Sequence, residues 1–168
     1  MTMKKQSKAA VQVKFGMNPA PQQGFTCVAL KDLKFPLPYK QQSLDAVSVE
    51  HLIEYLDGNT RIKFFNELWR VMKKGAQANV ISRAWSHAEA YADWRVQWPP
   101  ISEQWPMLMR KEMREAAVPD HPLTCDFDWT MGVGWDERLN LRNQEYKMDA
   151  MTANTNSLRF IIVNLTRK

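Results

Sequence analysis

The stretch from Ser43 to Gly75, SLDAVSVEHLIEYLDGNTRIKFFNELWRVMKKG, decides the fold that we expect for this chain. Residues 44–49 alternate between apolar and polar positions and are rich in β-branched side chains, which predicts a strand. Further along, apolar residues recur at three- and four-residue spacing, which predicts an amphipathic helix. These apolar residues are Ile62, Phe65, Leu68, Trp69 and Met72.

Both ends of this helix carry sequence signals. Asn59 or Thr60 can accept a hydrogen bond from the first turn and cap it. At the other end the lysines at 73–74 complement the helix dipole, and Gly75 can supply a left-handed stop. Residues 76–82 then read as another strand. A strand, a helix and a strand of these lengths predict a right-handed crossover between two parallel strands.

The residues before this stretch predict two shorter strands. Residues 10–15 alternate weakly, and residues 25–30 are apolar and β-branched. Between them lies a loop with two glycines and two prolines, residues 16–24. Strand, glycine-containing loop and strand is how a nucleotide-binding half-fold opens, although a helix normally lies between the strands. In the connector 31–42, the run FPLP at 35–38 excludes a helix interior and a central strand.

The residues after this stretch alternate between helical and extended patterns. A helix-prone run occupies 102–117, with Pro106 delaying its regular part. Residues 123–135 predict an extended strand or hairpin arm, residues 136–150 a helix capped by Asp136, and residues 158–165 a final strand. We therefore expect residues 1–168 to form a single α/β domain.

Composition limits the class of protein. Of the 168 residues, 45% are hydrophobic and 24% are charged, which suits a chain with a buried core. The net charge is +5, from 23 basic and 18 acidic residues, which permits weak attraction to nucleic acid. Residues 1–9 are polar and basic, and we expect a disordered tail. The sequence has no apolar run of membrane-spanning length, so we expect a soluble, cytoplasmic protein without membrane contact.

The cysteines and the candidate metal ligands favour structural roles. Cys27 and Cys125 are far apart and lack metal-ligand spacing, so we expect reduced, buried thiols. Asp126 and Asp128 share one face of a strand, where salt-bridged or solvated carboxylates are favoured over a metal site. The three histidines, at 51, 87 and 121, also lack ligand spacing. We predict no metal site.

Three motifs between residues 32 and 75 resemble the second half of class I S-adenosylmethionine-dependent methyltransferases. They are FPLP, SLDAVSVEHLIEYL and ELWRVMKKG. In that superfamily a strand ends in a segment of the type S-x-H-x-x-E-H, and the following helix ends in R-V-L-K-P-G-G. The matching residues are Ser48, Glu50, His51, Glu54 and Tyr55, followed by Arg70, Val71, Met72, Lys73, Lys74 and Gly75.

Motifs in the second half resemble one group within that superfamily. The runs ADWRVQWPPISEQ, KEMRE, CDFDW and NLTRK are similar to the C-terminal part of methyltransferase-like proteins common in phages and prophages. Together the resemblances cover most of the chain. They imply a three-layer, Rossmann-like fold with a mostly parallel sheet, S-adenosylmethionine as cofactor, and the cytoplasm of a bacterial host as location.

The first half departs from the superfamily. The loop after the first strand has the single glycine Gly16, where the superfamily has L-x-x-G-C-G. The acidic residue that holds the ribose is replaced by Ala29, and a segment after Leu30 is missing. The fold is therefore expected to be reduced in its N-terminal half. The resemblance implies that the cofactor-binding residues are Gly16, Asp32, Leu33, Ser48, Val49 and Glu50.

The expected acceptor side lies later in the chain. Residues 50–56 can form one or two helical turns, which places His51 near Glu54 and Tyr55. His51 is a candidate general base or orienting donor near the transferred methyl group, with a structural hydrogen bond to Glu54 or Tyr55 as the alternative. We name His51 and Asp93 as candidate catalytic residues, and Trp98 and Arg95 as candidate substrate-binding residues. Packing of the aromatic side chains is the alternative for this second group.

Three functions follow from these observations. The first is an S-adenosylmethionine-dependent methyltransferase of phage or prophage type with an unknown acceptor. The second is an inactive, methyltransferase-like binding or structural protein, because the donor motif departs from the superfamily. The third is a basic accessory protein that binds nucleic acid. A homo-oligomer or a complex with a phage or host protein is compatible with each of them.

Overall fold

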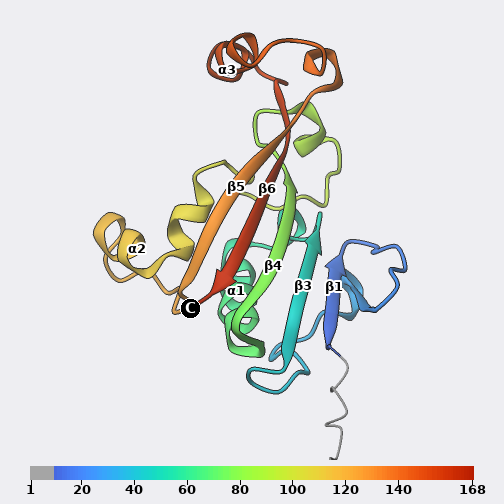
Figure 1. The fold of residues 1–168 in the computed structure, drawn as a ribbon, viewed down its shortest axis with the longest axis vertical. Coiled ribbons are helices and arrows are strands. Elements are labelled where there is room, and N and C mark those ends of the chain that lie inside the picture. Colours follow the sequence, from blue (N-terminus) through green and yellow to red (C-terminus); the bar gives the residue numbers. More distant parts are fainter. Residues whose placement is uncertain (1–9) are drawn as a thin grey trace, which may run out of the picture.

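The computed structural model describes residues 10–168, which form a six-stranded mixed sheet (Figure 1). The strand order is β2-β1-β3-β4-β6-β5. The first four strands in this order are parallel, and β6 runs antiparallel to both β4 and β5. The strands are β1 (Gln12–Gly16), β2 (Phe25–Ala29), β3 (Leu44–Glu50), β4 (Met72–Arg83), β5 (Phe127–Trp135) and β6 (Leu158–Arg167).

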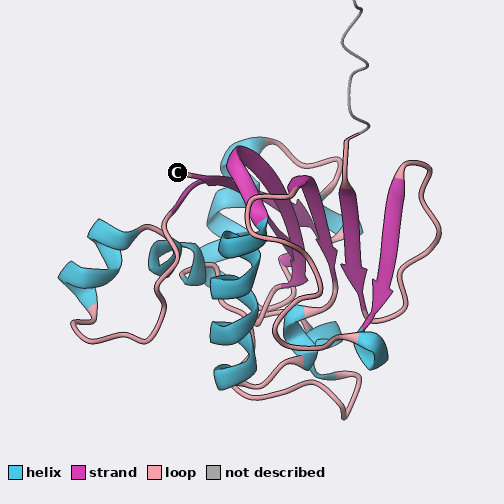
Figure 2. Ribbon diagram, turned by 90° about the horizontal axis from the view of Figure 1, so that it is seen from below, coloured by secondary structure: helices cyan, strands magenta, loops and turns pink. Residues whose placement is uncertain are grey.

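Three α-helices and five 3-10 turns connect the strands. Helix α1 packs against one face of the sheet (Figure 2), α2 lies beside β5, and α3 lies beyond the ends of β5 and β6. The helices are α1 (Gly58–Val71), α2 (Lys111–Ala117) and α3 (Gln144–Ala153), and the turns are η1 (Leu30–Asp32), η2 (Ile53–Tyr55), η3 (Ala88–Tyr91), η4 (Trp105–Met109) and η5 (Glu137–Leu139).

The core lies between α1 and the sheet. The apolar stripe of the helix buries Phe64, Phe65 and Leu68. The ring of Phe64 meets that of Phe15 on β1 edge to face, with centroids 5.5 Å apart. Burying each such side chain stabilises the fold by about 1.5–3 kcal/mol. The predicted β3–α1–β4 crossover is confirmed, since β3 and β4 pair in parallel.

The predicted signals at the ends of α1 are corrected by the structure. Asp57, rather than Asn59 or Thr60, is the N-cap, and its carboxylate accepts a hydrogen bond from the backbone of Thr60 (3.0 Å). The helix ends at Val71, before the expected stop. Backbone N–H groups of the segment just before β3 donate to the last carbonyls of α1, so the helix needs no left-handed stop there.

Gly75 does adopt the left-handed conformation, with φ of 77°, but inside β4. The pairing with β3 jumps at this point, from Leu44 opposite Met72 to Ala46 opposite Gln77. Additional residues on one strand of a pair form a β-bulge, which often contains a left-handed glycine. Gly75 therefore serves a bulge, where the sequence predicted a helix stop.

The N-terminal half is reduced as expected. Residues 17–24 join the parallel neighbours β1 and β2 without a helix, although such crossovers usually take a dozen or more residues. Gly16 is the last residue of β1, and there is no space for a side chain at this position. An added Cβ would lie 3.0 Å from the backbone oxygen of Glu50 and 3.2 Å from Cβ of Pro19. The compact turn after β1 thus requires a glycine at this position.

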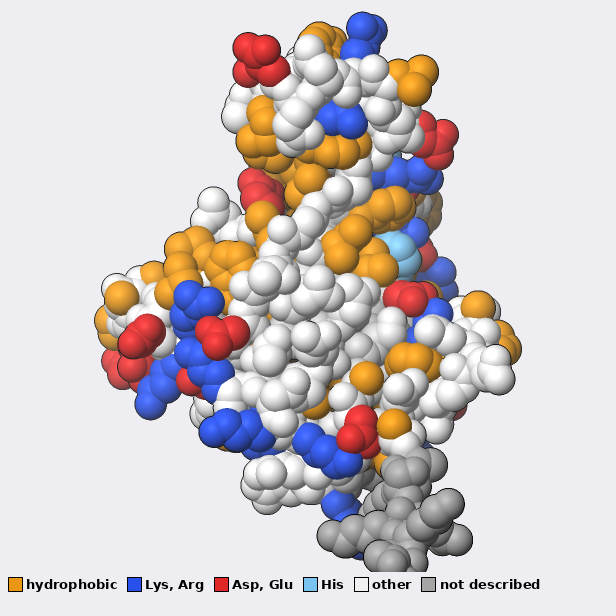
Figure 3. Space-filling view, in the orientation of Figure 1, with side chains coloured by type: hydrophobic (Ala, Val, Ile, Leu, Met, Phe, Trp, Pro, Cys, Tyr) orange, Lys and Arg blue, Asp and Glu red, His pale blue; other side chains and the backbone are white. Residues whose placement is uncertain are grey.

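The sheet face opposite α1 is open to solvent. Gln77 on β4 and Asn164 on β6 are exposed, and Ser48 and Asn79 are half-buried. Across the centre of this face, the side-chain amide of Asn79 donates to Asn164 Oδ1 (2.7 Å). Figure 3 looks onto this face, which is mostly backbone and uncharged polar side chains in its middle. Within residues 10–168 no helix packs across it, whereas doubly wound sheets carry helices on both faces.

Other expectations are settled by the same structure. Asp136 caps the short turn η5, and α3 begins only at Gln144, so the expected helix over 136–150 is interrupted.

Cys125 is buried, which raises the pKa of its thiol to about 12, whereas Cys27 is exposed, contrary to the prediction. Both thiols are free. The expected disordered tail at 1–9 lies outside the described residues. Over residues 10–168, no helix is long and apolar enough to cross a membrane.

Candidate functional site

His51 stands directly after β3, at the edge where parallel strands end. Its backbone is left-handed (φ 47°), and its N–H donates to the carbonyl of Ile81 on β4 (2.9 Å). This backbone geometry turns the imidazole toward Phe160 on β6, with ring centroids 5.4 Å apart. About a third of the side chain stays accessible (34%). In open α/β sheets this edge is where ligands bind.

Glu54 holds the imidazole of His51. Its Oε1 lies 3.1 Å from His51 Nδ1 and also accepts the backbone N–H of Arg83 (2.7 Å). The residue is only 2% exposed, and its Oε2 has no partner within the described residues. A carboxylate can only accept, so it places the hydrogen on Nδ1 and leaves Nε2 as an acceptor. The hydrogen bond to Glu54 that the sequence suggested is thus confirmed.

Asp93 lies in a neighbouring cluster around Tyr55. Arg95 forms a close ion pair with it, with Nη2 2.6 Å from Oδ2, and the Tyr55 hydroxyl donates to the same oxygen (3.3 Å). Arg83 in turn donates to the Tyr55 hydroxyl (3.3 Å). The Arg95 guanidinium holds the pKa of Asp93 well below its ordinary value. Asp93 is therefore an engaged anion, suited to orienting a ligand rather than to accepting a proton.

Aromatic side chains surround this cluster. Trp94 and Trp98 are 98% and 80% exposed, and with Asp93 they line a small cavity of about 180 Å³. The Arg95 guanidinium lies over the Tyr55 ring, 5.9 Å from its centroid. An exposed tryptophan ring can offer its face to a flat or cationic group. The structure therefore brings the predicted substrate residues Trp98 and Arg95 together with Asp93.

Four of the six predicted cofactor residues are at least partly exposed, namely Asp32, Leu33, Ser48 and Glu50. Gly16 lies opposite Glu50 in the β1–β3 register and is buried, and Asp32 and Leu33 follow β2 through η1. Val49 is also buried, with its side chain fully enclosed (0% exposed) in the core. Its side chain is therefore not available to a ligand.

Glu50 is tied into an ion pair that the sequence analysis missed. Its Oε2 lies 2.7 Å from Nζ of Lys14, whose side chain is only 9% exposed, and its Oε1 accepts a hydrogen bond from Ser48 (3.2 Å). The sequence signal for this ion pair was the position of Lys14 inside a short apolar strand, because a buried lysine needs a partner. The pair neutralises one carboxylate at the place where a cofactor is expected.

The residues present fit S-adenosylmethionine in part. The exposed carboxylate of Asp32 would supply an acceptor for its ammonium or hydroxyl groups, whereas Glu50 is already paired with Lys14. At the expected ribose position, Ala29 supplies only a methyl group, so a charge-assisted hydrogen bond is missing there. Donor binding would rest mainly on Asp32.

The candidate metal ligands are engaged in other contacts. Asp126 and Asp128 lie 3.4 Å and 3.6 Å from the Lys168 ammonium, and Asp128 also pairs with Arg110 (3.1 Å). The favoured interpretation of a salt-bridged face is confirmed. His87 lies 3.3 Å from Asp136, away from the other histidines. Within residues 10–168 no group of three or more acidic, histidine or cysteine side chains could hold a metal ion.

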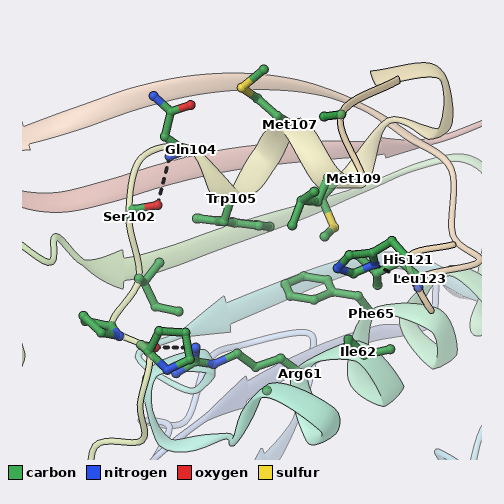
Figure 4. A pocket seen from close by; sticks show the side chains of 16 residues that line it. Arg61, Ile62, Phe65, Ser102, Gln104, Trp105, Met107, Met109, His121 and Leu123 are labelled. Atoms are coloured by element: carbon green, nitrogen blue, oxygen red, sulfur yellow. Dashed lines mark hydrogen bonds between the residues drawn. The ribbon is translucent and has the colours of Figure 1, made fainter. Parts of the chain in front are cut away.

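Sequence analysis also missed a larger cavity on the α1 side of the sheet. It has a volume of about 550 Å³ and lies between α1, η4 and the segments 99–102 and 117–123 (Figure 4). None of the predicted site residues lines it. A groove between a helix and a distant loop leaves no local pattern, so only the structure could reveal it.

Comparison with known proteins bears on the fold. No protein-family model matches the sequence, and no curated protein is similar to it. Among solved structures, an S-adenosylmethionine-dependent methyltransferase from Archaeoglobus fulgidus is similar with a TM-score of 0.62 at 13% identity, over 95% of this chain and 86% of that one. A second such methyltransferase, from Thermotoga maritima, has a TM-score of 0.53 at 13% identity, over 96% and 84%.

A larger enzyme contains the same architecture. Phosphoethanolamine N-methyltransferase 2 from Haemonchus contortus, solved with S-adenosyl-L-methionine, has a TM-score of 0.53 at 8% identity. The match covers 97% of this chain and 50% of that one. The chain thus has the Rossmann-like fold of S-adenosylmethionine-dependent methyltransferases, which confirms the predicted fold class.

Proposed function

We propose that this chain is an S-adenosylmethionine-dependent methyltransferase that acts at the ends of β3 and β4. The observation that carries the proposal is the His51–Glu54 pair: a partly exposed imidazole, held by a buried carboxylate, at the ligand-binding edge of a methyltransferase-type sheet. The second-half motifs support a phage or prophage type, in the cytoplasm of the host.

The cofactor, when bound, supplies an activated methyl group, so the protein has mainly to position the acceptor and remove its proton. Nε2 of His51 would accept the proton of the acceptor O–H or N–H as the acceptor atom takes the methyl group; the carbon–sulfur bond of the donor breaks and S-adenosylhomocysteine leaves. Glu54 fixes the ring by its hydrogen bond to Nδ1 and stabilises the imidazolium that results. Trp98 and the Asp93–Arg95 pair hold the acceptor beside the histidine.

Turnover assays with paired variants test this proposal. The readout is S-adenosylhomocysteine released from S-adenosylmethionine in the presence of fractionated host extract as the source of acceptor. Replacing the base, as in His51→Ala, should lower the rate about 10²–10⁴-fold, and Glu54→Gln should lower it less. Glu103→Gln, a change at a half-buried carboxylate bonded to Trp85, is the matched control. Release of product at equal rates by wild type and His51→Ala would contradict the role of His51.

The second candidate is an inactive binding protein with the same fold. It is favoured by the methyl group of Ala29 at the ribose position and by the Lys14–Glu50 pair, which both weaken the donor site. The open sheet face supplies a surface on which a protein partner could pack. A folded protein that neither binds S-adenosylhomocysteine nor turns over on any extract fraction would favour this candidate over the enzyme.

A further inference from the structure

The small cavity beside Asp93 is lined mainly by exposed aromatic rings. Three large aromatic side chains reach it, namely Tyr91, Trp94 and Trp98, and each of them is at least half exposed. Soluble proteins rarely expose large contiguous apolar patches, and those that they do expose often mark interaction sites. The rest of the lining is aliphatic or amide, apart from the carboxylate of Asp93. The lining therefore combines ring faces with one acidic group.

Among the described residues that line the cavity, Asp93 alone carries a charge. Its ion-pair partner Arg95 is not part of the lining. The guanidinium of Arg95 lies instead over the ring of Tyr55, 5.9 Å from the centroid. The ion pair therefore presents its negative end to the cavity. Because the nearer charge of a pair dominates at short range, this end attracts a cation.

Two further guanidinium groups near the cavity are bound to other acceptors. Arg83 donates to the Tyr55 hydroxyl (3.3 Å), and Arg61 donates to the carbonyls of Gln97 and Pro99. Neither arginine lines the cavity. The cation–π contacts within residues 10–168 all involve other rings, so the faces of the three lining rings are available to a ligand.

We propose that this cavity binds the ammonium group of the methyl acceptor, an inference that rests on the proposed function. The volume of about 180 Å³ is smaller than the roughly 300–1,000 Å³ of pockets that hold drug-sized ligands, so it suits one end of a molecule. The electron-rich ring faces attract a cation, and a methylated ammonium group also buries its methyl groups against them. An uncharged group of the same shape gains the apolar contact alone.

The cavity is joined to the pair formed by His51 and Glu54. The backbone N–H of Gln97, which lines the cavity, donates to the carbonyl of Glu54 (2.8 Å). Asp93 accepts from the hydroxyl of Tyr55, which lies on the same turn η2 as Glu54. An acceptor that is anchored in the cavity by its ammonium group therefore lies beside the turn that holds the imidazole.

The test uses two probes of equal shape, choline and its uncharged carbon isostere 3,3-dimethylbutan-1-ol. Binding to the protein without S-adenosylmethionine is followed through the indole N–H signals of isotope-labelled protein, with the signal of Trp98 assigned from Trp98→Leu. We expect choline to shift the Trp98 signal and to bind at least about fivefold more tightly than the alcohol. Absence of saturable choline binding, or equal binding of both probes, would overturn the proposal.

Variants place the probe in the cavity. Trp98→Leu removes an exposed ring and should lower the affinity for choline about fivefold or more. Asp93→Asn keeps an acceptor for the backbone N–H of Arg95 but removes the charge, so choline should bind more weakly while the alcohol binds as before. Tyr146→Leu, at an exposed ring of α3 outside the cavity, is the control and should bind choline as wild type does. Undiminished choline binding by either cavity variant would refute the assignment.

Failure of this inference can be told apart from failure of the proposed function. If choline does not bind while the release of S-adenosylhomocysteine still depends on His51, the ammonium site is wrong and the methyltransferase stands. If choline binds as expected and no extract fraction supports turnover, the ammonium site stands, and its occupant is not a methyl acceptor.

Discussion

At the scale of single residues, the imidazole of His51 takes its role from its surroundings. The left-handed backbone turns the ring toward Phe160, and the buried Glu54 fixes its Nδ1. The sequence predicted that His51 and Glu54 meet, because they stand three positions apart. The expected helical turn over 50–56 is reduced to η2 at Ile53–Tyr55, and His51 precedes it with a left-handed backbone.

The burial of Glu54 could not be predicted, because it depends on segments that are distant in the sequence. The position of Lys14 in an apolar strand signalled that it needs a partner, but not that the partner is Glu50.

Gly16 provides a test of residue-scale packing. In Gly16→Ala the new Cβ would lie 3.0 Å from the Glu50 carbonyl, which belongs to a central strand and cannot move freely. We expect the free energy of unfolding to fall by about 1–3 kcal/mol, as for other overpacked sites. Chemical denaturation measures it.

Gly132→Ala is the matched control, because the space around that glycine on β5 is empty within 4 Å. Its free energy of unfolding should stay close to that of wild type. Equal stability of the Gly16 and Gly132 variants would show that the turn after β1 is looser than the structure indicates.

At the scale of elements, the amphipathic stripe of α1 and the parallel crossover to β4 could be predicted because both depend on local periodicity. The helix ends could not, because they depend on tertiary contacts. The chain before β3 bonds to the last carbonyls of α1, which lets β4 start at Met72. Gly75 was recognised as a left-handed glycine but assigned to the helix, since a bulge and a helix stop have the same sequence signal.

The bulge in β4 predicts an unusual response to substitution at Gly75. Its Cβ position is empty within 4 Å, so only the positive φ opposes a side chain. Gly75→Ala should lower the free energy of unfolding by about 1 kcal/mol, and Gly75→Asn should lower it less, because asparagine tolerates this conformation better. Thermal unfolding of the two variants gives the comparison. Equal losses would argue against a left-handed residue at this position.

Helix α1 is also clamped to the proline-rich connector, which makes its stability depend on pH. Glu67 accepts from the Arg70 guanidinium (2.7 Å) and from the backbone N–H of Leu37 (2.8 Å). The bond from Arg70 is the main cause that lowers the pKa of Glu67. A carboxyl whose pKa is lower in the folded state stabilises the protein above its unfolded pKa, near about 4.3, and loses that effect as the pH falls.

The expected result is a stability difference between wild type and Glu67→Gln that is large at about pH 6 and shrinks toward about pH 3. Denaturant unfolding across this range measures the difference. Glu145→Gln, at an exposed position of α3, should give a small and constant difference. A gap for Glu67→Gln that grows on acidification would mean that the clamp does not act through the ionised carboxylate.

At the scale of the whole molecule, the chain keeps the strand order of a methyltransferase-type sheet while one sheet face stays open. The strand pattern and the motif around Ser48 and His51 were enough to predict this fold class. The open face was not predicted, although the alternation of apolar and polar residues at 44–49 is typical of a strand that is buried on one face only. The cavity behind α1 brings together segments 58–65, 99–109 and 117–123, and no local pattern signals such a meeting.

The most direct test of the central claim is a calorimetric titration of the protein with S-adenosylhomocysteine. The account predicts saturable binding with a dissociation constant in the micromolar range, and affinity reduced about tenfold or more in Asp32→Ala. Asp128→Ala, whose carboxylate pairs with Lys168 and Arg110 away from the strand ends, should bind as wild type does. No heat at millimolar ligand, or equal affinity of the Asp32→Ala and wild-type proteins, would contradict a donor site at the ends of β1, β2 and β3.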